Sequence, residues 1–138
     1  MTTYRARVLS PVSPTAVTWL DDAFVVVEDG RFAAVGSYDG RPVDEDLRPA
    51  VLVPGFIDSH VHFPQTRIVG AATGPLLEWL AKSTFPEEER FAEPDFAARI
   101  AELFCDRLVA AGTTLAMVYG SVHPAASEAL FAAGWTEP

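Results

Sequence analysis

The stretch VLVPGFIDSHVH, residues 51–62, decides the fold class. An apolar run that ends in polar residues is typical of a parallel strand covered on both faces, with functional side chains at its carboxyl end. Residues two apart in a strand project from the same face, so the imidazoles of His60 and His62 can point at one ion. Neutral imidazole is a good ligand for zinc and other borderline divalent metals. The pair is therefore a candidate metal site, and Asp58 shares its face as a further ligand or as a support for one histidine. The alternative is two unliganded histidines, one exposed and one hydrogen-bonded to a carbonyl group.

From residue 51 onward, strands alternate with helices. Proline at position 75 predicts the start of a short helix over 75–80, and apolar residues at helical spacing predict a longer helix over 94–111. Gly112 suits the left-handed cap that ends such a helix. A strand over 113–119 and a helix over 124–133 follow. This order predicts a parallel α/β fold, either open or closed into a barrel.

The first fifty residues follow a different pattern of strands and turns. Asp29-Gly30 lies between two runs rich in valine and alanine, which predicts a hairpin with a two-residue turn between strands over 24–28 and 31–36. The acidic stretch 37–48 predicts a solvated loop. We therefore expect a small β domain over residues 1–52 and an α/β domain over residues 53–138.

Composition narrows the classes of function. The chain has 138 residues, a net charge of −9 and 49% hydrophobic residues, which predicts a globular protein that binds neither nucleic acid nor an anionic membrane. Neither a signal peptide nor an apolar run long enough to span a membrane is evident. The single cysteine, Cys105, cannot form an internal disulfide and is interpreted as a small apolar residue on a buried helix face. These features predict a soluble, cytoplasmic protein.

The segment PGFIDSHVH, residues 54–62, resembles the signature of the amidohydrolase superfamily, in which a hairpin-rich β domain precedes the first barrel strand. Four further segments narrow the resemblance to the guanine deaminases of that superfamily: HFPQ (62–65), GPLLEWL (74–80), TFPE (84–87) and AGTT (111–114). The resemblance extends over about residues 53–133. It implies the start of a TIM-like (β/α)8 metal-dependent hydrolase barrel, preceded by part of a small β-sandwich domain.

The resemblance also implies a reaction, the zinc-dependent hydrolytic deamination of guanine to xanthine and ammonia in purine catabolism. His60 and His62 would bind Zn²⁺, and Gln65 would hydrogen-bond the purine, because a carboxamide offers both a donor and an acceptor. Trp79 and the leucines beside it would either line a flat purine pocket or pack in the core. Formation of a homodimer by the full-length form is left open.

The chain departs from the family pattern in its later parts. The family takes two further histidine ligands from later strands, one within a His-x-x-Glu segment, and an aspartate from the last strand. None can be located here, and the proton-transferring glutamate stays unassigned. His123 follows the second strand and could approach the site, but Ala126, not glutamate, stands three residues on, so a surface or structural role is expected for it.

Length supports the same interpretation. A complete barrel needs about 250 residues, and residues 132–138 depart from the family where a third strand is due. We therefore expect an incomplete N-terminal portion that is inactive alone. Two barrel strands cannot close on themselves, so Phe56, Ile57, Leu115 and Val118 are expected to lack the partners that later strands provide.

Several alternatives stay open: another amidohydrolase deaminase, a small metal-binding module, or a fragment without catalytic function. The cytidine-deaminase fold is excluded because its Pro-Cys-x-x-Cys ligand pair requires two cysteines. The charged run from Glu87 to Arg90 is interpreted as a solvated turn.

Overall fold

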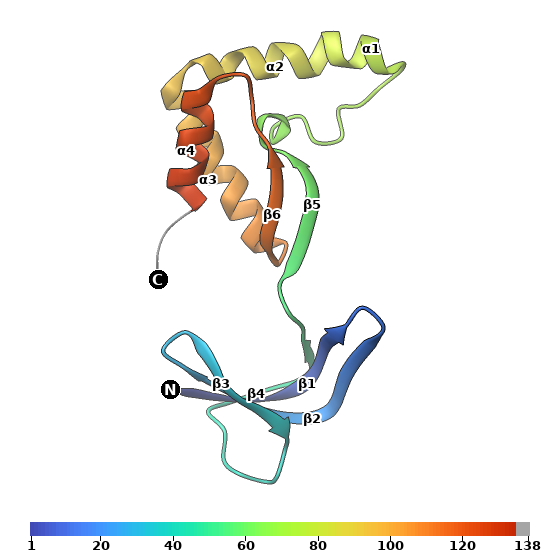
Figure 1. Cartoon of the computed structure of the whole chain (residues 1–138), viewed down its shortest axis with the longest axis vertical. Coiled ribbons are helices and arrows are strands. Elements are labelled where there is room, and N and C mark those ends of the chain that lie inside the picture. The colour runs from blue at the N-terminus through green and yellow to red at the C-terminus, as the bar shows by residue number, and fades with distance from the viewer. Residues whose placement is uncertain (135–138) are drawn as a thin grey trace. The chain divides into compact units, whose positions relative to one another are not determined.

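A computed structural model describes residues 1–134 and separates them into two compact units (Figure 1). The first unit covers Met1–Pro54, and the second begins at Gly55. Residues 135–138, the end of the predicted α/β domain and of the atypical segment 132–138, lie outside the described residues. Within residues 1–134, no helix combines the length and the apolar character that a membrane crossing requires.

The first unit is a four-stranded sheet with the order β3-β2-β1-β4. β1 (Thr2–Ser13) pairs antiparallel with β2 (Ala16–Glu28), β2 pairs antiparallel with β3 (Arg31–Ser37), and β4 (Glu45–Leu52) lies parallel to β1. The predicted hairpin is confirmed: Asp29 and Gly30 both have positive φ, 49° and 72°, as its tight turn requires. Within residues 1–134, this unit contains one sheet. The second sheet that a β-sandwich requires therefore stays a prediction.

Two sequence expectations around β4 were wrong. The predicted loop 37–48 ends within a strand, because Glu45 already belongs to β4. Acidic residues are tolerated on this edge strand since they pair with arginine: Asp46 accepts two hydrogen bonds from the Arg48 guanidinium, which lowers the pKa of the carboxyl. The apolar run 51–62 is also not one strand. β4 ends at Leu52 and β5 begins at Phe56, with Pro54 in the connection.

The second unit has the predicted order of strand, helices, strand and helix. β5 (Phe56–His62) and β6 (Thr113–Tyr119) form a parallel pair. Between them lie a 3-10 turn (Phe63–Gln65), α1 (Leu76–Trp79), a π-helical segment (Leu80–Thr84), α2 (Phe85–Glu89), a second 3-10 turn (Arg90–Ala92) and α3 (Pro94–Ala110). α4 (Pro124–Gly134) follows β6. Gly112 has φ 78° and ends the α3 turn, as predicted.

Aromatic side chains build the core of this unit. Phe63 is fully buried, and its ring meets Phe91 and Phe104 edge-on at centroid distances of 5.0 and 5.6 Å. These three rings belong to one cluster of buried residues, whose other members are Phe96, Ala97, Ile100, Ala101 and Ala126. Val61 and Val118 pack against it from the two strands. One face of the β5–β6 pair is therefore covered by helices.

These residues do not form the strand covered on both faces that a complete barrel would contain. Phe56 and Ile57 are 60% and 69% exposed, which confirms the expectation that two strands alone leave these side chains without partners. Of the two alternatives for the leucines beside Trp79, packing in the core was wrong for Leu76 and Leu77, because both side chains are exposed on α1.

The predicted solvated turn was wrong for Glu87. This residue lies in α2 and is only 8% exposed, with Arg90 at 3.2 Å and Arg67 at 3.6 Å from its carboxylate oxygens. Paired cations make burial of a carboxylate tolerable.

Candidate metal centre

The two predicted ligands meet at the carboxyl end of β5. The pairing register between β5 and β6 shifts between Asp58 and Val61, so the ladder is irregular just before the last two residues of β5. Val61 then faces the helical core, and His60 and His62 project from the other face. Their Nε2 atoms are 3.2 Å apart. The structure thus brings together the two residues that the sequence selected.

This spacing fits shared coordination of one ion. A tetrahedral ion with bonds of about 2.0–2.1 Å to each imidazole nitrogen places those nitrogens about 3.3 Å apart. The observed separation of the Nε2 atoms is within about 0.1 Å of that value. The distance is therefore compatible with the two imidazoles sharing one zinc-like cation. A hydrogen bond between opposite tautomers also satisfies the distance, and metal titration separates the two states.

The other candidate ligands do not join the pair. The Asp58 carboxylate accepts a hydrogen bond from the backbone N–H of His60 at 3.0 Å, which supports the backbone of the strand end. His123 lies beyond β6, where its backbone N–H bonds to the Ser121 hydroxyl at 3.1 Å. In the chain up to residue 134, no three His, Cys, Asp or Glu side chains cluster at metal-binding distance. The site described here consists of two ligands.

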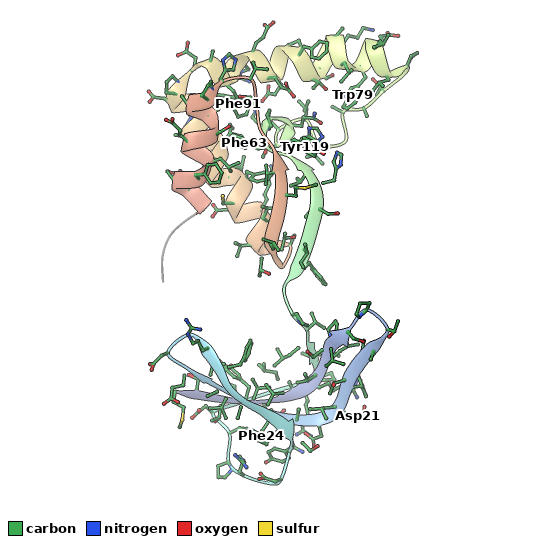
Figure 2. The ribbon with its side chains drawn as sticks, viewed as in Figure 1. Asp21, Phe24, Phe63, Trp79, Phe91 and Tyr119 are labelled. Atoms are coloured by element: carbon green, nitrogen blue, oxygen red, sulfur yellow. The ribbon has the colours of Figure 1, made fainter. Side chains whose placement is uncertain are left out.

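Sequence reasoning missed Tyr119. This residue ends β6 and pairs with His62 in the parallel register, which places its ring beside both imidazoles (Figure 2). The ring centroids lie 4.7 Å from His60 and 4.8 Å from His62. The available signal was positional: Tyr119 is the last residue of the second parallel strand, as His62 is of the first.

Gln65 directly follows the histidines in a firmly anchored turn. Phe63 and Pro64 before it are fully buried. Thr66 after it bonds through its hydroxyl to the Phe63 carbonyl, and the Thr66 carbonyl accepts a hydrogen bond of 2.6 Å from the Arg107 guanidinium on α3. The half-buried Gln65 side chain is therefore carried by backbone that is fixed on both sides.

Trp79 is the second predicted substrate contact. It lies on α1 and is half-buried (Figure 2). Its indole Nε1 is enclosed and has no hydrogen-bond partner within residues 1–134. The role of Trp79 in substrate binding stays a prediction.

Comparison with known proteins identifies the class. The model of the Amidohydrolase family matches residues 51–136, which include the histidine pair and both parallel strands. The chain therefore belongs to the amidohydrolase family.

Within this family, the chain is similar to guanine deaminases. The probable guanine deaminase of Deinococcus radiodurans is 40% identical over 96% of this chain and 34% of its own length. The structure of E. coli guanine deaminase superposes with a TM-score of 0.81 at 32% identity, covering 96% of this chain and 34% of that one. A guanine deaminase from C. acetobutylicum with guanine bound in its active site gives a TM-score of 0.79 at 28% identity, over 95% and 32% of the two chains. The 138 residues thus span about a third of the length of these relatives.

Proposed function

We propose that this chain contributes the first two strand–helix units of a zinc-dependent guanine deaminase with a TIM-like (β/α)8 barrel, in which His60 and His62 are metal ligands. The observation that carries the proposal is the 3.2 Å separation of their Nε2 atoms at the carboxyl end of a parallel strand. Barrel enzymes place their chemistry at that end of the strands. The similarity to guanine deaminases, one of which contains bound guanine, supports guanine as the substrate.

The residues of this chain have separate tasks in the proposed reaction, in which guanine and water give xanthine and ammonia. His60 and His62 would hold a divalent ion, which would supply the Lewis acidity that makes water a nucleophile near neutral pH. Gln65 binds the purine edge as donor and acceptor, and its anchored turn fixes the backbone that carries this amide. Trp79 contributes an aromatic face. These groups bind and orient the substrate.

The proposal gives a specific expectation for the 138 residues taken alone. Two imidazoles leave zinc short of the three protein ligands that catalytic sites use. The apolar side chains of Phe56, Ile57 and Leu115 are exposed and lack a cover. We expect this polypeptide to bind zinc weakly, to show no deaminase activity, and to associate or aggregate in solution.

The test uses the whole protein encoded by the gene from which this chain derives. This protein is called the gene product below. Zinc content after dialysis and conversion of guanine to xanthine are measured for the natural protein and for His60→Ala and His62→Ala. Both variants should lose zinc and activity together. His123→Ala is the matched control, because it removes the third imidazole of the chain outside the pair.

Gln65→Ala distinguishes substrate binding from metal binding. We expect it to raise KM for guanine while zinc content stays at the natural level. Retention of zinc in both histidine variants would overturn the metal assignment. Zinc binding without turnover by the gene product would instead support a metal-binding module.

A further inference from the structure

An aromatic residue contacts both candidate metal ligands. Tyr119 stacks on His62 with ring planes 13° apart and centroids 4.8 Å apart, and it lies 4.7 Å from His60 at a tilt of 38°. The two imidazoles are 5.2 Å apart between centroids. Tyr119 comes from the neighbouring strand and not from the strand that carries the ligands. Its ring therefore fixes the pair from a second element of the fold.

The histidines need such a contact because little else orients their rings. Metal-binding histidines usually donate their second N–H to a carboxylate, a backbone carbonyl or water, and that bond sets the ring orientation. Among the described residues, neither imidazole is hydrogen-bonded to a carboxylate or a carbonyl, and Asp58 contacts the backbone of His60. Rotation of either side chain would move the two Nε2 atoms apart, beyond the distance at which both can bind one ion.

We propose that Tyr119 is a positioning residue that holds His60 and His62 in chelating geometry through its ring. This inference rests on the proposed metal-binding role of the pair. The ring, and not the hydroxyl, carries the effect, since the Tyr119 hydroxyl makes no hydrogen bond within the part of the chain that is described. Aromatic contacts of this geometry stabilise by amounts that correspond to about threefold to tenfold in an equilibrium constant.

The test compares two substitutions at this position in the gene product. Tyr119→Phe keeps the ring and removes the hydroxyl. Tyr119→Ile removes the ring and keeps a residue that favours strands, and the site tolerates it because Tyr119 is 44% exposed and outside the aromatic core. Phe131→Ile is the matched control, because this aromatic residue is 65% exposed on α4 and touches neither histidine ring.

Zinc affinity is measured by competition with a chromophoric chelator after the metal has been removed. Tyr119→Ile should weaken zinc binding by about threefold to tenfold, and Tyr119→Phe should stay within about twofold of the natural protein. A second measurement is independent of metal and activity: the nuclear Overhauser effect between the ring protons of His60 and His62 in the metal-free protein should weaken in the Ile variant and persist in the Phe variant. Thermal unfolding confirms that each variant is folded.

Unchanged zinc affinity in Tyr119→Ile would overturn the inference. Equal weakening in the Phe and Ile variants would also overturn it, because the hydroxyl would then be responsible. Weaker zinc binding in Phe131→Ile would show that the loss of affinity reflects lower stability of the fold and not the position of the ring. Failure of the metal proposal gives a different result, namely His60→Ala with undiminished zinc.

Discussion

The burial of Phe63 predicts that a single truncation in the core destabilises the unit that carries the candidate site. The side chain is 0% exposed and meets Phe91 and Phe104 edge-on, at 5.0 and 5.6 Å. Truncation of a buried phenylalanine to alanine costs about 3–5 kcal/mol. The two lost aromatic contacts place Phe63→Ala in the upper half of that range, at about 4–5 kcal/mol. This is a large part of the stability of an ordinary domain, which is about 5–15 kcal/mol.

The assay is urea unfolding followed by the helical circular dichroism signal. All described helices lie in the second unit, so this signal reports on the unit that contains Phe63. Phe63→Leu fills most of the space and should cost about 1–1.5 kcal/mol, which gives a measurable value if the alanine variant is unfolded. Phe131→Ala, at a position 65% exposed, should cost less than about 1 kcal/mol. Equal losses in Phe63→Ala and Phe131→Ala would refute the assignment of Phe63 to the core.

Three further predictions follow from single contacts. A Cβ on Gly55 would lie 2.1 Å from the Thr114 hydroxyl oxygen, so Gly55→Ala should cost about 1–3 kcal/mol of unfolding free energy, and less in a Thr114→Gly background; equal costs in both backgrounds would contradict the clash. Arg107→Met removes the bond that fixes the turn after Gln65 and should raise KM for guanine about threefold to tenfold in the gene product, with zinc retained; lost zinc would contradict it. Burial raises the pKa of the Cys105 thiol, so less thiolate is present at pH 8, and alkylation by iodoacetamide should be slower in the folded protein than in urea; equal rates would contradict it.

The parts of the fold that depend on local pattern could be predicted from the sequence. The hairpin turn at Asp29-Gly30, the α3 helix and its Gly112 cap, and the β6 strand all follow from residues close together in the chain. The His60–Val61–His62 spacing likewise placed both imidazoles on one face. Local geometry was sufficient for these features because it requires no knowledge of distant partners.

Features that depend on distant partners could not be predicted. Glu87 looked solvated because it stands in a charged run, yet Arg67, twenty positions earlier, lies close enough to compensate its burial. Tyr119 reaches the histidines only through the parallel register between two strands that are separated by three helices. The single sheet of the first unit depends on which other strands are present, which a local pattern does not specify.

The segment from His62 to Gln65 joins the chemistry of the site to the stability of the fold. Its four residues are a candidate ligand, two fully buried anchors and a candidate substrate contact. A weakened core therefore disturbs both functions together, because Phe63 and Pro64 fix the backbone on which His62 and Gln65 stand. Tyr119 acts on the imidazole rings from outside that core, so its loss should lower zinc affinity while the unfolding free energy changes little. Metal affinity and stability should thus fall together for Phe63→Leu and separate for Tyr119→Ile, which distinguishes support of the site by the core from direct positioning of its ligands.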